Sequence, residues 1–167
     1  MRVLLVAGLN DLLKGGTFES VQQDIKRLAG NMTVQNGIHP GLTNELSVAT
    51  LFNPPKMVWF SDNGTPPPGH ADRQDDLTQV NEWIITFNRQ NSRLCAPRFH
   101  NLGTRTTKKM VNGSWQIFKT HRWNEWRKSE PRHDMLHLSD QLRVKMGKQI
   151  VNYFEGENDR HGHINYG

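Results

Sequence analysis

Strand-like and helix-like segments alternate along this chain, and the alternation restricts the possible folds more than any other feature. Residues 2–7 form a short, continuous, Val- and Leu-rich run, which is typical of a buried strand. Similar runs cover residues 46–51 and 98–102. Because helices that cross between successive strands produce parallel pairing, we predict an α/β fold with a short parallel sheet.

Three further segments carry apolar residues at helical spacing. The first begins after Thr17, a predicted N-cap, and ends near Gly30. The second covers roughly residues 72–92, and the third residues 142–154. The apolar positions are Phe18, Val21, Ile25 and Leu28 in the first, Leu77, Val80, Trp83, Ile84 and Phe87 in the second, and Leu142, Val144, Met146, Ile150, Val151 and Phe154 in the third.

The length of 167 residues suits one domain, which we expect over residues 1–154, followed by a flexible tail at 155–167. A Pro- and Gly-rich stretch at 61–69 predicts a loop. No apolar run is long enough to span a bilayer, and none resembles a signal region after Met1. The single cysteine, Cys95, has no internal disulfide partner. These features predict a cytoplasmic protein without a transmembrane segment.

Basic residues concentrate in one part of the chain. Between Arg98 and Arg132, nine Lys and Arg residues accompany two acidic ones, so the remainder carries about −2 of the net +5. Trp115, Trp123 and Trp126 interleave with these cations, which suits a nucleic-acid surface that combines stacking with phosphate neutralisation. The alternative is a substrate-side loop whose tryptophans pack on the sheet while its charges stay solvated.

Two short motifs near the ends of the chain carry groups that suit acyl-transfer chemistry. Residues 8–11 read Gly-Leu-Asn-Asp after the first predicted strand, and residues 134–137 read Asp-Met-Leu-His before the last predicted helix. The Asn10 amide can donate to a developing oxyanion, and a carboxylate such as Asp134 can orient His137 as a general base. Taken singly, the first motif also reads as a capped turn and the second as a helix cap beside a surface histidine.

Together, in this order, the motifs resemble the C-terminal portion of the SGNH hydrolase superfamily, the GDSL-type lipases and esterases. The family patterns Gly-x-Asn-Asp and Asp-x-x-His match residues 8–11 and 134–137, and the resemblance covers residues 2–154. Residues 50–56, Thr-Leu-Phe-Asn-Pro-Pro-Lys, also resemble esterase-type domains in first-frame proteins of some animal retrotransposons.

The resemblance implies a three-layer α/β/α, flavodoxin-like fold and a carboxylic ester hydrolase that uses neither metal nor organic cofactor. It gives Asn10 the oxyanion role in the turn at Gly8, His137 the role of general base, and Asp134 that of its orienter. The implied substrate is an acyl ester, either a small molecule or a lipid.

The chain departs from the family at the nucleophile, because the Gly-Asp-Ser block that follows an earlier strand in the family occurs nowhere in this sequence. Ser61 and Ser139 are the nearest serines by context, but loop and cap roles explain them better, and we assign no nucleophile. The chain is then either the C-terminal portion of a longer esterase or a degenerate relative. In both cases we expect no activity from the chain alone, and self-association through the uncovered edge of strand 2–7.

A second hypothesis, which assigns the chain to a class of binding proteins, is also compatible with the sequence. It is a non-catalytic, basic nucleic-acid-binding module of a mobile-element protein that uses residues 98–132. Steep loss of binding with salt would distinguish such a module from a hydrolase.

Overall fold

A computed structural model gives the fold. It describes residues 2–33, 45–54, 74–92, 95–121, 126–129 and 132–156, and for 32, 33, 74, 119, 121, 126–129 and 132–137 it describes the backbone only. The predicted loop at 61–69, with Ser61, and tail residues 157–167 lie outside the described residues.

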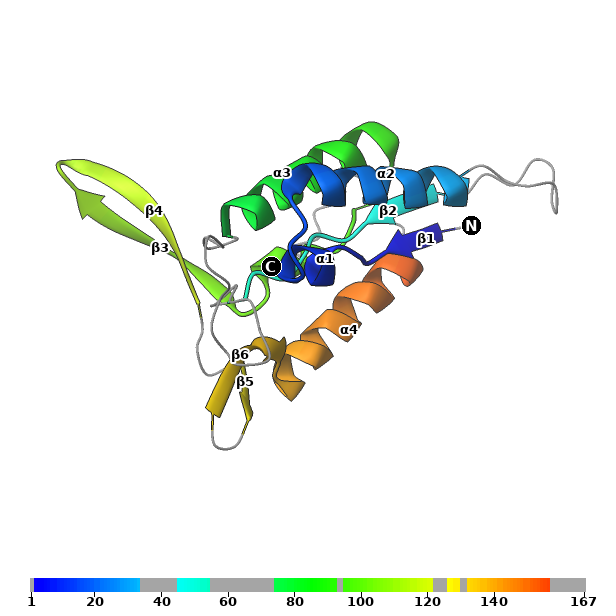
Figure 1. Cartoon of the computed structure of the whole chain (residues 1–167). Helices are drawn as coiled ribbons and strands as arrows, with labels where there is room; N and C mark the ends of the chain where they lie inside the picture. Colours follow the sequence, from blue (N-terminus) through cyan, green and yellow to red (C-terminus); the bar gives the residue numbers. More distant parts are fainter. Residues whose placement is uncertain are drawn as a thin grey trace.

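The body is built around a parallel pair of strands (Figure 1). β1 (Arg2–Leu5) pairs with β2 (Glu45–Val48) in parallel, which confirms the predicted pairing. Parallel neighbours require a crossover between them, and α1 (Leu9–Leu13) and α2 (Phe18–Thr33) lie on that connection.

The start of α2 follows the sequence prediction closely. The Ser20 N–H donates to Thr17 Oγ1 at 3.2 Å, and the Thr17 N–H donates to Ser20 Oγ at 2.9 Å. This reciprocal pair satisfies backbone donors that the first helical turn leaves without partners. The helix ends at Thr33, so the predicted stop at Gly30 is three residues early.

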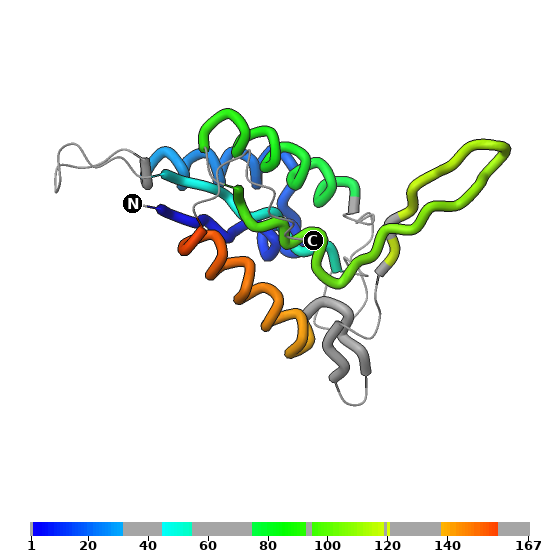
Figure 2. The backbone as a smooth tube through the Cα atoms, turned by 180° about the vertical axis from the view of Figure 1, so that it is seen from behind, coloured from blue at the N-terminus to red at the C-terminus, as the bar shows by residue number. Residues whose placement is uncertain are grey.

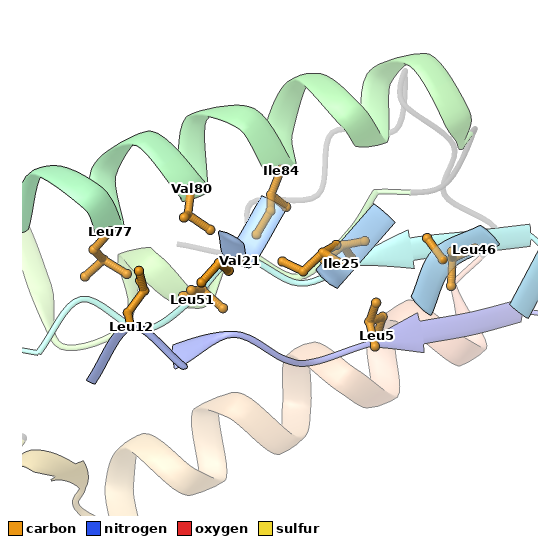
Figure 3. Close-up of a cluster of buried hydrophobic side chains, with 11 residues drawn as sticks. Leu5, Leu12, Val21, Ile25, Leu46, Leu51, Leu77, Val80 and Ile84 are labelled. Carbon is orange, nitrogen blue, oxygen red and sulfur yellow. The ribbon is translucent and has the colours of Figure 1, made fainter. Parts of the chain in front are cut away.

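One hydrophobic cluster joins α2 and α3 (Gln74–Asn91) to one face of the parallel pair (Figure 3). The apolar positions predicted for these two helices supply most of it, which confirms their helical spacing. Trp83 and Phe87 pack against the cluster as ordinary core residues. Its buried members are Leu5, Leu12, Val21, Ile25, Ala29, Leu46, Val48, Leu51, Leu77, Val80 and Ile84.

The final helix, α4 (Asp140–Glu155), packs on the other face of the pair (Figure 1). A second cluster lies there, formed by buried Ala49, Phe99, Leu102 and Leu142. Only part of the apolar face predicted for this helix is buried. Leu142 is fully buried, whereas Val144, Val151 and Phe154 are exposed.

The predicted third strand at 98–102 is wrong. Phe99–Asn101 form a 3₁₀ turn, η1, whose Phe99 is fully buried in the second cluster and stacks on Phe52 with ring centroids 5.1 Å apart. The Thr50 N–H donates to Pro97 O at 3.3 Å, so this segment still runs beside the end of β2. Aromatic burial, and not strand pairing, fixes its position.

The basic region contains strands that its irregular hydrophobic pattern did not predict. β3 (Thr104–Val111) pairs antiparallel with β4 (Ser114–His121), and β5 (Trp126–Ser129) with β6 (Arg132–Leu138). Asn112 and Gly113 join the first two strands with φ values of 49° and 81°, as a type I′ hairpin turn requires.

The described residues therefore form a mixed α/β structure, with a two-stranded parallel sheet and two antiparallel hairpins. The β3–β4 hairpin projects far from the body in both views (Figures 1 and 2). None of the helices in the described part of the chain has the length and apolarity that a bilayer crossing requires.

Candidate functional site

Gly8 makes the turn that follows β1. Its φ is 114°, in the region that only glycine adopts without strain, and it is buried. A Cβ at this position would lie 3.0 Å from Val21 Cγ1 and 3.5 Å from Leu51 Cδ1. The sharp turn and the close approach of α2 both require glycine here, as the sequence predicted for a tight bend.

Asn10 lies in the first turn of α1, directly beyond the carboxyl end of β1. It is exposed, and its backbone carbonyl accepts the Lys14 N–H at 2.9 Å. Buried Leu12 anchors this short helix in the first cluster. Within the described part of the chain, no hydrogen bond engages the side-chain amide of the exposed Asn10.

Asp134 and His137 lie in β6, and only their backbone is described. Neither caps α4. That role belongs to Ser139, whose Oγ accepts the Leu142 N–H at 3.3 Å, which confirms the reading of Ser139 as a cap serine. The segment that the sequence placed just ahead of the last helix is thus a strand followed by a one-residue cap.

The backbones of the two motifs lie toward the same end of the parallel pair. α1 and the end of β6 both lie beyond the carboxyl ends of β1 and β2 (Figure 1). Leu138, next to His137, packs against the second cluster, as does Phe52, which follows β2. Carboxyl ends of parallel strands are where sites of open α/β sheets form.

A hydroxyl–imidazole pair lies at this same end, with Thr50 buried and His100 half-buried. Thr50 Oγ1 is 2.7 Å from His100 Nδ1 and also accepts the backbone N–H of His100 at 3.1 Å. An imidazole beside a hydroxyl is the arrangement that activates a nucleophile. Here, however, Thr50 is buried, and its oxygen already accepts a backbone donor, so the pair serves to dock η1 onto the end of β2.

Sequence reasoning missed this pair because it assigned residues 98–102 to a strand. The available signal was the apolar Phe99 flanked by polar residues, which also suits a docked turn. Among the described residues, no group of three or more His, Cys, Asp or Glu side chains is placed to hold a metal ion.

A second candidate surface is the projecting β3–β4 hairpin, which we call the ribbon (residues 104–121). Its sequence contains Arg105, Lys108, Lys109 and Lys119 and no acidic residue. Trp123 and Arg122, which the sequence also suggested for a nucleic-acid surface, lie outside the described residues. For Trp126, Arg127 and Lys128 the structure gives the backbone of β5 only.

Comparisons of the chain with protein-family models, with curated proteins and with solved structures find no match.

Proposed function

We propose that this chain is the C-terminal portion of an SGNH-type ester hydrolase domain, completed by a strand and a helix that carry the nucleophilic serine. The observation that carries the proposal is an asymmetry of the parallel pair. One of its edges is closed by a helix, whereas no described strand pairs with the other, and α4 carries exposed apolar residues.

The outer edge of β2 is closed by side-chain amides from α3. Asn88 accepts the Val48 N–H at 2.9 Å and donates to the Val48 carbonyl at 2.8 Å. Asn81 does the same with Leu51, at 2.6 and 3.1 Å. Each amide therefore replaces the pair of bonds that a neighbouring strand would make.

Among the described residues, the outer edge of β1 has no such cover. The Ala49 N–H donates to the Leu5 carbonyl, so Leu5 and, by alternation, Val3 face β2. The backbone groups of Arg2 and Leu4 then face away, and no strand lies on that side in the described part of the chain. Parallel strands normally lie inside a wider sheet, so this edge is suited to receive another strand.

The α4 helix carries exposed apolar residues, and its C-terminal end lies next to the start of β1. Val144, Val151 and Phe154 share one side of the helix, because seven and ten residues correspond to about two and three turns. The Arg2 guanidinium donates to the carbonyls of Tyr153, Phe154 and Gly156, which holds the end of α4 next to the start of β1. A strand paired with β1 and a helix packed on α4 would cover both surfaces at once.

The proposed reaction is hydrolysis of a carboxylic ester through a serine-linked acyl intermediate. The serine on the added strand attacks the carbonyl carbon, and His137 accepts its proton. Asp134 is proposed to orient His137, which is compatible with β6 because the register with β5 shifts between His133 and Leu138 and interrupts the regular alternation of faces. The Asn10 amide donates to the oxyanion of the tetrahedral intermediate, and the alcohol leaves with the proton from His137. Water then hydrolyses the acyl enzyme by the same steps.

The test begins with the transcript that encodes this chain. We expect an in-frame segment with a strand and a Gly-Asp-Ser block ahead of Met1, and hydrolysis of p-nitrophenyl acetate by the extended protein. Asn10→Ala should lower kcat by about 10²–10³. His137→Ala should abolish turnover, whereas Gln23→Ala, an exposed change on α2, should leave it unchanged. A transcript without such a block, or turnover that survives both site changes, would overturn the proposal.

We also propose a second function, binding of nucleic acid by the basic region. The specific observation in its favour is the acid-free ribbon, which extends into solvent with three of its cations exposed, Arg105, Lys108 and Lys109. Retention of a labelled oligonucleotide at low salt, lost as salt rises, tests it. The two functions do not exclude each other, because a hydrolytic site and a basic arm can share one fold.

A further inference from the structure

The two faces of the ribbon differ. In the antiparallel register Lys108 lies opposite Ile117, and Met110 lies opposite Trp115. Cross-strand partners share a face, and positions two residues apart along a strand do too, so these four residues form one surface. We call it the ribbon face.

On the other surface of the ribbon, the side chains contact one another. Lys109 Nζ lies 5.8 Å from the centroid of the Phe118 ring. Arg105 Nε donates to Thr120 Oγ1 at 3.4 Å across the strands. These contacts partly occupy the apolar and cationic groups of that surface.

On the ribbon face the large apolar side chains lie open to solvent. The exposed fractions are 68% for Trp115, 67% for Ile117 and 54% for Met110. A two-stranded hairpin on its own is marginally stable in water, and contiguous exposed apolar groups mark interaction surfaces. The ribbon face therefore has the character of a binding surface.

The surrounding charge restricts what covers it. The ribbon contains four Lys and Arg residues and no Asp or Glu, so it repels basic partners and attracts polyanions. The indole offers a flat surface for stacking, and the thioether and the branched aliphatic chain offer apolar contact, which together suit the faces of unstacked bases. Duplex DNA hides its base faces inside the stack and presents phosphates and base edges instead. Single strands present base faces and phosphates together.

We infer that the ribbon face binds single-stranded nucleic acid, with a base stacked on Trp115, further bases against Met110 and Ile117, and Lys108 on the backbone phosphates. This inference rests on the nucleic-acid function proposed above and adds the strandedness of the ligand and the surface that holds it. The Asn112-Gly113 turn holds the two strands of the ribbon in this register.

The experiment measures the binding of a fluorescein-labelled 20-nucleotide oligo(dT) to the whole chain by fluorescence anisotropy. A 20-base-pair duplex with the same label is the comparison. We expect tighter binding of the single strand and a slope of log K against log salt of about −2, as about three phosphate contacts would give.

Variants on the two faces of the ribbon separate stacking from charge. Trp115→Ala should weaken oligo(dT) binding by about 10- to 100-fold, and Trp115→Phe, which keeps an aromatic ring, should retain most of the affinity. Phe118→Ala removes a ring from the opposite surface and should change the affinity less than threefold. Lys108→Gln should lower the salt slope, whereas Lys148→Gln, an exposed charge change on α4, should not.

The outcomes distinguish this inference from the broader proposal. If oligo(dT) binds but Trp115→Ala binds as well as wild type, or the duplex binds as tightly, the inference fails and a general nucleic-acid function survives. If neither nucleic acid is retained at low salt, both fail. Equal competition by vesicles of phosphatidylserine and phosphatidylcholine would also overturn the inference, because the face would then recognise an anionic surface without regard to bases.

Discussion

At the scale of single residues, Tyr153 connects the last helix to the first strand. Its hydroxyl donates to the Val3 carbonyl at 2.8 Å, and its ring is buried. Burial raises the pKa of Tyr153 above 10.0, and the nearby Glu45 carboxylate acts in the same direction. The hydrogen bond to the Ser47 side chain and the charge of Arg2 oppose that rise without cancelling it.

The raised pKa of Tyr153 predicts a loss of stability in base. The folded state keeps the phenol proton at a pH where the unfolded state has released it, so the contribution is full below about pH 10 and declines as pH rises toward the folded pKa. We expect Tyr153→Phe to lower the free energy of unfolding by about 0.5–1.5 kcal/mol at pH 8. Urea unfolding of both proteins between pH 8 and 11 should show this difference shrinking, because titrations common to both cancel. If the difference in unfolding free energy between the two proteins stayed constant with pH, the raised pKa of Tyr153 would be contradicted.

Gly8 gives a second prediction at this scale. Gly8→Ala forces an L-residue to φ 114° and brings its Cβ against Val21, so we expect about 1–3 kcal/mol of destabilisation. The matched control is Gly147→Ala in α4, where an added Cβ meets nothing within 4 Å. That change should stabilise the protein by about 0.5–1 kcal/mol. Thermal unfolding measures both, and equal effects of the two changes would be inconsistent with strain at Gly8.

At the scale of elements, α3 covers the edge of β2 because the distance between two asparagines on the helix matches the distance between their backbone partners. Asn81 and Asn88 are seven residues apart, about 10 Å along a helix, and their partners Leu51 and Val48 are three residues apart, also about 10 Å in extended chain. The two amides therefore meet the backbone at both points without distortion. This cover prevents the edge of β2 from pairing with another strand.

A substitution of Asn81 tests whether α3 closes the edge of β2. Asn81→Asp keeps the acceptor for the Leu51 N–H but replaces the donor to the Leu51 carbonyl with a second carboxylate oxygen, in a buried place. We expect a loss of about 1–3 kcal/mol in urea unfolding at pH 7. Gln23→Glu, an exposed amide-to-acid change on α2, should stay within about 0.5 kcal/mol. If Asn81→Asp were equally mild, the amide could not be closing the edge.

At the scale of the whole molecule, the two edges of the parallel pair have opposite character. Helix α3 closes the β2 edge, while among the residues that the structure describes no strand pairs with the outer edge of β1, which exposed Val6 follows. An open strand edge with apolar neighbours favours pairing with another chain.

The chain by itself should therefore self-associate through β1. We expect sedimentation velocity to show association that increases with protein concentration, and Val6→Lys to suppress it by placing a charge beside the edge. Gln23→Lys, which places a charge at an exposed site on α2 away from this edge, should have a smaller effect. A sharp, monomeric, reversible unfolding of the unmodified chain would argue against an unfinished sheet.

Prediction from sequence succeeded where one local rule applied. The Thr17–Ser20 pair defines a helix start by itself, and the apolar spacing in α2 and α3 gave their buried faces. It failed at residues 99–101, where an apolar residue among polar ones fits a strand and a docked turn equally well. The Asn112-Gly113 dipeptide is a hairpin signal, but the residues that flank it do not alternate cleanly between apolar and polar, so the sequence did not predict the two strands.

The candidate site follows the same division. The sequence alone determined the residue types at positions 10, 134 and 137, and the glycine that the turn at position 8 requires, because these depend on local chemistry and backbone geometry. Only the tertiary structure decided which edge of the parallel pair is closed, that Thr50 contacts His100, and that the basic segment forms a projecting ribbon. Those features depend on contacts between residues far apart in the chain, and local periodicity carries no information about such contacts.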